Sequence, residues 1–105
     1  MQRLLLISLL LPLATYAAGA DYKLTIKSHR FQPSELVIPT DQRVKLLVVN
    51  QDATPEEFDS YDLNREKIIA GNSRAIIFIG PLTSGRYVFT GEFHAATAQG
   101  AIVAK

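Results

Sequence analysis

Residues 43–50 read RVKLLVVN, a nearly continuous run of leucine and β-branched side chains. Such a run favours extended backbone and leaves no polar stripe for solvent, which is typical of a strand with both faces covered. The sequence therefore predicts a central β-strand over residues 43–50, with protein packed against each of its two sides.

Shorter segments of the same kind lie on both sides of this strand. Leu24 and Ile26 alternate with polar neighbours over residues 23–27, which is the period-two pattern of a half-buried strand. Residues 55–65 are acidic and only weakly strand-like, and we expect a loop or a helical turn there. Further strands are predicted at residues 35–38, 67–70, 74–79, 86–90 and 100–104.

Together these segments predict an all-β fold, a Greek-key β-sandwich of about seven strands. Gly71-Asn72 is expected to form a tight turn between two of the strands. The pattern Leu82-x-x-Gly85-x-Tyr87 resembles a tyrosine corner, in which the phenol hydroxyl bonds back to the chain. The sequence contains no cysteine, so disulfides, thiol catalysis and cysteine-type zinc sites are excluded.

The first twenty residues have the layout of a secretory signal peptide. Arg3 supplies the positive charge, Leu4 to Leu13 form an apolar run, and Ala18-Gly19-Ala20 offers a cleavage site. A transmembrane helix needs about 20 apolar residues, which is longer than this run. We therefore predict that residues 1–20 are removed and that residues 21–105 form one periplasmic domain with no membrane anchor; an uncleaved anchor is the alternative.

The charges are balanced and scattered along the sequence. The chain has 11 Lys and Arg against 10 Asp and Glu, and without Arg3 the two classes are equal. Nucleic acids and anionic membrane surfaces require concentrated positive charge, so the sequence argues against both as partners. The main local asymmetry is acidic and comprises Glu56, Glu57, Asp59 and Asp62.

Three ordered segments cover nearly all of the predicted domain. They are Phe31-x-Pro33-x-x-Leu36-x-Ile38-Pro39, then NQDATPEEF at residues 50–58, then Tyr87-x-Phe89-x-Gly91-x-x-His94 with Gly100-x-Ile102-x-Ala104. In this order and at these separations, the segments resemble the bacterial cupredoxin-like domain family. The resemblance implies a cupredoxin-like sandwich with a metal site at one end.

The resemblance also implies where the metal ligands of a blue-copper protein would fall. The two histidine positions fall on Glu56 and His94, the cysteine position on Gly91 and the methionine position on Thr97. Only His94 keeps the ligand of the family. Because a blue-copper centre requires a cysteine thiolate, an ordinary blue-copper electron carrier is excluded.

A finer resemblance concerns residues 56–60 (EEFDS), the stretch from Leu63 to Lys67, and residues 91–94 (GEFH). These resemble a variant of the family that is encoded beside bacterial high-affinity iron permeases. The resemblance implies a periplasmic accessory of ferrous-iron uptake, with copper or iron as the bound metal. The implied partners are a membrane iron permease and other periplasmic iron-uptake proteins.

Topology groups the candidate ligands independently. Successive loops of an antiparallel Greek-key sandwich alternate between its two ends, so the connections that carry the two histidines and most of the acidic residues are expected at one end. Imidazole with carboxylate favours copper(II), iron or zinc over copper(I). The predicted metal ligands are, in decreasing order, His94, Glu56 and Glu92, and then Glu57, Asp59 and His29.

Three functions stay open on these grounds. The first is the metal-binding accessory of ferrous-iron uptake, with iron oxidation or electron transfer as its role. The second is a structural or docking module whose metal site has been lost. The third is a periplasmic copper-binding chaperone.

Overall fold

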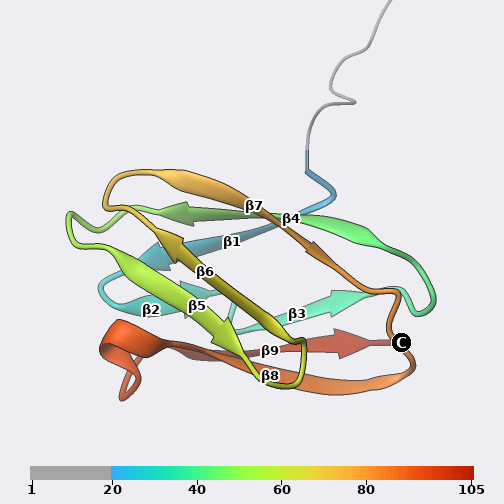
Figure 1. Ribbon diagram of the computed structural model, residues 1–105. Coiled ribbons are helices and arrows are strands. Elements are labelled where there is room, and N and C mark those ends of the chain that lie inside the picture. The colour runs from blue at the N-terminus through green and yellow to red at the C-terminus, as the bar shows by residue number, and fades with distance from the viewer. Residues whose placement is uncertain (1–19) are drawn as a thin grey trace, which may run out of the picture.

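Nine strands form two β-sheets packed face to face in the computed structural model, which describes residues 20–105 (Figure 1). One sheet has the order β2-β1-β4-β7 and the other β3-β9-β8-β5-β6. The predicted signal peptide lies outside the described residues, apart from Ala20. The strands are β1 (Tyr22–Lys27), β2 (Arg30–Gln32), β3 (Glu35–Ile38), β4 (Val44–Asn50), β5 (Glu56–Ser60), β6 (Arg65–Ile69), β7 (Arg74–Ile79), β8 (Gly85–Gly91) and β9 (Gln99–Ala104).

The predicted all-β sandwich is confirmed, with nine strands in place of about seven. All the predicted strands are present, and the short strand β2 is an addition. Strand β5 corrects the expectation of a loop or helical turn at residues 55–65. Burial alternates along β5, with Glu56 and Phe58 turned inward and Glu57 and Asp59 half-buried. Pairing with β6 and β8 outweighs the weak strand propensity of its acidic residues.

Strand β4 lies inside its sheet, between β1 and β7, but it is covered on one face only. Val44, Leu46 and Val48 are buried, whereas Leu47 and Val49 are half-buried on the outer face. The prediction of a strand covered on both faces is therefore wrong. A continuous apolar run fixes the strand but not the number of its covered faces, which depends on the packing of other segments.

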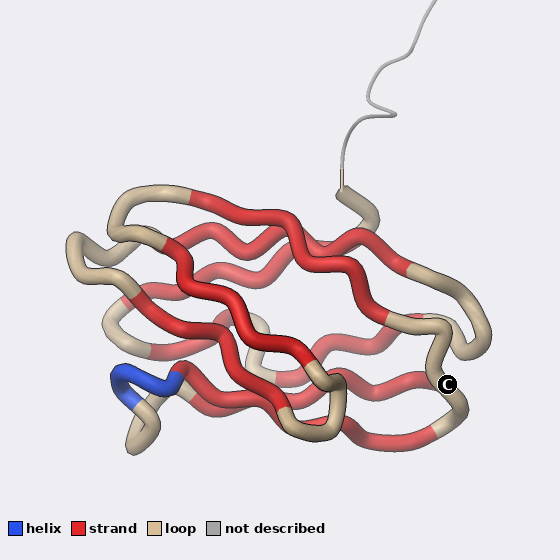
Figure 2. The backbone as a smooth tube through the Cα atoms, in the orientation of Figure 1, coloured by secondary structure: helices blue, strands red, loops and turns tan. Residues whose placement is uncertain are grey.

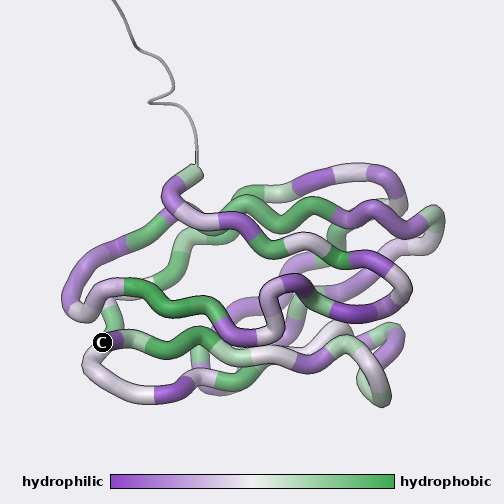
Figure 3. The backbone as a smooth tube through the Cα atoms, turned by 180° about the vertical axis from the view of Figure 1, so that it is seen from behind, coloured by the Kyte–Doolittle hydropathy of each residue, from purple (hydrophilic) through white to green (hydrophobic). Residues whose placement is uncertain are grey.

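Three phenylalanines form the centre of the core. Phe58 of β5 and Phe89 of β8 stack with their ring centroids 4.8 Å apart, and Phe31 of β2 lies edge-on to Phe89, also at 4.8 Å. All three side chains are at most 3% exposed. Because Phe31 and the other two rings come from opposite sheets, the cluster joins the two layers. Figure 3 shows hydrophobic residues along much of the strands, while the loops are mainly hydrophilic.

The corner before β8 has the predicted bond. The hydroxyl of Tyr87 donates to the carbonyl of Thr83 at 2.7 Å, which confirms the tyrosine corner. The predicted Gly71-Asn72 turn is also present and leads from β6 in one sheet to β7 in the other. Among the residues that the structure describes, none belongs to a helix with the length and apolar character needed to cross a membrane.

Candidate metal centre

One end of the sandwich brings together His29, Glu56 and His94. His29 lies in the turn between β1 and β2, and Glu56 is the first residue of β5. His94 ends a short 3-10 helix, η2 (Glu92–His94), which follows β8. Figure 2 shows η2 in blue at this end of the molecule, next to the start of β5 in Figure 1. Three connections far apart in sequence therefore meet, as the loop count predicts.

Glu56 is the central group of this cluster, and its side chain is only 1% exposed. Its Oε1 accepts the backbone N–H groups of Glu57 at 3.0 Å and Phe93 at 2.9 Å. Its Oε2 lies 2.6 Å from Nδ1 of His94. Buried carboxylates are stable only when such partners satisfy them. The Glu56 side chain thereby fastens η2 to the start of β5.

His29 stacks on His94, with the ring centroids 3.6 Å apart and the planes inclined by 10°. The nitrogen lone pairs of an imidazole lie in the plane of its ring, so two stacked rings direct them along parallel planes. As placed, the two histidines do not converge on one ion. The neighbouring Thr97 hydroxyl donates to the His29 carbonyl at 2.6 Å, which ties the two connections together.

Asp52 holds the turn that presents His29. Ser28 and His29 both have positive φ angles, 54° and 58°, as two-residue hairpin turns with the twist of the strands require. Asp52 accepts the backbone N–H of Ser28 at 2.8 Å and that of His29 at 2.9 Å. Its own N–H donates to the side chain of Asn50 at 3.0 Å. The sequence analysis missed this positioning role, because the two hydrogen bonds join residues 24 and 23 positions apart and leave no local pattern.

These contacts change the acidity of Asp52. The hydrogen bond from the His29 N–H, with that from Ser28 and the charge of the two imidazoles when protonated, holds the pKa of Asp52 below its usual value of 3.8, although burial acts in the opposite direction. A lowered pKa in the folded state means that Asp52 stabilises the fold at neutral pH. This contribution is lost as the pH falls below the usual value and through the folded one.

We expect Asp52→Asn to lower the free energy of unfolding by about 1 kcal/mol at neutral pH, because it removes the charge and one acceptor. The difference from the wild type should shrink as the pH falls below 3.8. Denaturant unfolding of the metal-free protein at neutral and acidic pH measures it. Asp41→Asn, at an exposed turn position, is the control. A difference that stays constant down to low pH would contradict the assigned role.

The remaining predicted ligands do not join this cluster. Glu57 and Asp59 alternate with Glu56 along β5 and lie on the outer face of the sheet, and Glu92 is exposed. Partial desolvation, followed by the negative charges of the neighbouring carboxylates, raises the pKa of Glu57. Of the acidic residues on β5, only Glu56 therefore lies beside the histidines. Glu57 and Asp59 lie on the other side of the sheet.

The donor set does not fit a blue-copper ion. A Cβ atom at Gly91 would lie 2.6 Å from the Glu56 carboxylate carbon and 2.6 Å from the Cβ of Ala98, so the space for a cysteine is filled. Within residues 20–105, no three or more His, Cys, Asp or Glu side chains are arranged to hold a metal. Imidazole and carboxylate do suit a divalent ion of borderline softness, provided that it replaces the hydrogen shared by His94 and Glu56.

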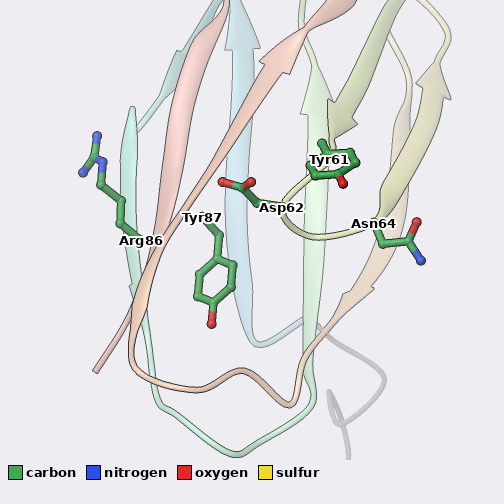
Figure 4. A pocket seen from close by; sticks show the side chains of 5 residues that line it. All are labelled: Tyr61, Asp62, Asn64, Arg86 and Tyr87. Carbon is green, nitrogen blue, oxygen red and sulfur yellow. The ribbon is translucent and has the colours of Figure 1, made fainter.

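A hollow of about 660 Å³ lies at the other end of the sandwich. Figure 4 shows its lining, which comes from the β5–β6 turn and the start of β8. Three of its polar side chains are engaged within the domain: Asp62 accepts the Val88 N–H at 3.0 Å, Arg86 pairs with Glu35, and Tyr87 is bonded to its corner. Both histidines of the chain and a buried carboxylate lie at the other end, which favours the His94 end as the functional site.

Comparisons with known proteins agree with this architecture. A family model described as a cupredoxin-like domain matches residues 3–104. An uncharacterized protein of Rickettsia prowazekii (strain Madrid E) is 42% identical over 83 residues, which are 79% of this chain and 66% of that protein. The chain thus spans just under two thirds of the length of this relative.

Several solved structures are similar in fold. Auracyanin A, a blue copper protein of Chloroflexus aurantiacus, superposes over 83% of this chain and 100% of its own with a TM-score of 0.70 and 15% identity. Amicyanin of Paracoccus versutus matches over 83% and 84% of the two chains with a TM-score of 0.65 and 14% identity. A purple cupredoxin of Nitrosopumilus maritimus covers 81% and 100% with a TM-score of 0.61 and 19% identity. At these identities the likeness shows the fold alone.

Proposed function

We propose that this chain, which belongs to the cupredoxin-like domain family, is a periplasmic accessory protein of ferrous-iron uptake that binds a divalent copper or iron ion. The observation that carries the proposal is the buried Glu56 carboxylate on the partly exposed ring of His94. The link to iron uptake rests on the resemblance of residues 56–60 and 91–94 to the permease-associated variant. A membrane iron permease is accordingly the proposed partner.

Glu56 and His94 are the residues that would hold the ion. Glu56 offers carboxylate oxygens in a site screened from water, where electrostatic attraction to a cation is strong. His94 remains 26% exposed in its side chain, so it can meet an incoming ion from solvent. A bound copper or iron ion would supply one-electron chemistry suited to ferrous iron. His29, fixed by Asp52, lies against His94 and limits the rotation of its ring.

A second candidate is the docking module without a metal. Residues at the positions of the family's metal ligands favour it, because they already have partners within the domain. Both Glu56 oxygens and the Thr97 hydroxyl are hydrogen-bonded, and the space beside Gly91 is filled. The copper chaperone has less support. Copper(I) prefers thiolate or thioether ligands, and the chain has no cysteine and one methionine, Met1.

Metal titration of the purified, metal-free protein separates the metal-binding accessory from the docking module. At a hundredfold excess over the dissociation constant, an ion that binds only the folded state adds about 2.7 kcal/mol of stability. For a domain of this size that is a rise in melting temperature of roughly 10 °C or more. We expect the rise with copper(II), or with iron(II) without oxygen, and copper resonance spectra showing nitrogen and oxygen ligands.

Two variants make the titration specific. His94→Ala should abolish the rise, whereas Glu66→Gln, which removes an exposed carboxylate on β6, should leave it unchanged. If copper(II), iron(II) and zinc(II) all leave the melting temperature of the wild type unchanged, the metal-binding proposal is refuted and the docking module takes its place.

A further inference from the structure

The four-stranded sheet turns an outer face to solvent that carries much of the positive charge of the domain. Along β4 and β7, Lys45 lies opposite Phe78 and Val49 opposite Arg74, and the burial pattern places these side chains outward. The same alternation places charged residues of β1 and β2 on this side. We call this surface the basic face; its cations are Lys23, Lys27, Arg30, Arg43, Lys45 and Arg74.

The centre of the basic face is apolar. Leu47 lies opposite Ile76, and the side chains of Ile76 and Phe78 are 39% and 40% exposed. The Arg43 guanidinium lies 4.2 Å from the centroid of the Phe78 ring, and the Lys45 ammonium 6.0 Å from it. Long cationic side chains thus extend over an apolar surface and keep their charged ends in water, which is the arrangement of amphipathic side chains at an interface.

The charge is divided between the two sheets. The strands of the four-stranded sheet contain five basic residues and no acidic one, whereas those of the other sheet contain all the strand carboxylates. At the edge of the basic face, Asp21 accepts the backbone N–H of Lys45 at 2.9 Å. A nearly neutral domain is therefore strongly polarised, and a negatively charged plane would orient it with the basic face inward.

We propose, against the expectation from the scattered charges of the sequence, that the basic face docks the domain onto an anionic lipid bilayer. Clusters of four to eight Lys and Arg are typical of sites that bind anionic lipid, and each contributes about 1 kcal/mol near such a surface. The exposed Phe78 and Ile76 would contact the boundary between headgroups and acyl chains. This surface does not involve the histidine cluster, so the inference is independent of the metal proposal.

The size of the face favours a bilayer over an acidic protein. The four strands are three to seven residues long and, at about 3.3 Å per residue and about 4.8 Å between strands, cover roughly 350 Å². A stable protein interface buries about 800 Å² on each partner, which is more than twice that area. A bilayer requires neither this area nor a complementary shape, because charge attraction and shallow apolar contact are sufficient for reversible binding.

Vesicle co-sedimentation tests the proposal with the full chain and a chelator present. The wild type should bind vesicles of phosphatidylcholine with phosphatidylglycerol, bind pure phosphatidylcholine weakly, and be released by added salt. The variant Lys23→Gln/Lys45→Gln/Arg74→Gln should bind the anionic vesicles roughly 100-fold more weakly, since each lost cation is a factor of about five. Melting curves confirm that the variants fold.

The matched control is Lys67→Gln/Arg86→Gln/Lys105→Gln, which removes the same charge elsewhere on the domain and should keep most of the binding. All variants contain residues 1–20, so any affinity of that apolar run for lipid is common to them. Equal losses in both variants, no release of the wild type by salt, or no binding to anionic vesicles would each overturn the proposal. Binding to soluble polyglutamate but not to vesicles would overturn it in favour of an acidic protein partner.

Discussion

Replacing Phe58 with alanine is expected to lower the free energy of unfolding by about 3–5 kcal/mol, the usual cost of truncating a buried aromatic side chain. Phe58 has no exposed surface and contacts the rings of Phe31 and Phe89. Truncation of its side chain removes the contacts with both other rings and opens a cavity between the sheets. Because domains of this size are stable by only about 5–15 kcal/mol, this loss is a large fraction of the total, and the variant should have a much lower melting temperature.

Denaturant unfolding measures this loss of stability, and an exposed residue next to β5 provides a control. Tyr61 follows β5 directly and is 98% exposed, so Tyr61→Ala should change the stability by less than about 0.5 kcal/mol. Phe58→Leu, which keeps most of the volume, should cost far less than alanine. A cost below about 1 kcal/mol for Phe58→Ala would contradict the central position of this ring in the core.

The second large effect is expected at Glu56. Glu56→Ala should cost about 2–4 kcal/mol, because it leaves the partly buried N–H groups of Glu57 and Phe93 without their acceptor and opens a cavity where the buried carboxylate lay. Glu56→Gln keeps the shape and one acceptor oxygen, and its amide can donate to Nδ1 of His94. The glutamine variant should therefore cost only about 1 kcal/mol.

A double-mutant cycle identifies the origin of this cost. If the Glu56–His94 contact fastens η2, the effects of Glu56→Ala and His94→Ala should add to more than that of the double variant, since each removes the same contact. Glu57→Gln, at the neighbouring outward position, is the control. Equal costs for the glutamine and alanine variants at position 56 would show that the charge, rather than the acceptor geometry, stabilises the site.

Much of the fold is predictable because hydrophobic periodicity is local. The segments at residues 23–27, 35–38 and 74–79 show their strands directly. Strand β5 is the exception: its outward residues are acidic, and its inward Glu56 breaks the apolar alternation. The information that makes it a strand lies in β6 and β8, which are its neighbours only after folding.

The candidate site is likewise predictable from the sequence only in part. Loop counting brings the connections of His29, Glu56 and His94 to one end, since alternation of loops is a property of topology. It cannot supply the direction of a side chain, so Glu57 and Asp59 were predicted beside Glu56 although the strand turns them outward. The support of His29 by Asp52 depends on a hydrogen bond between residues 23 positions apart, which leaves no local pattern.

By itself, the sequence determined that this chain folds as an all-β sandwich and lacks the cysteine that blue copper requires, because short-range periodicity and composition carry these properties. The tertiary structure decided how charges and donors are arranged in space. Lys and Arg residues that occur singly along the chain gather on one face, because strands distant in sequence lie about 4.8 Å apart in a sheet. In the same way, folding places the Glu56 carboxylate in the space beside Gly91 and against His94.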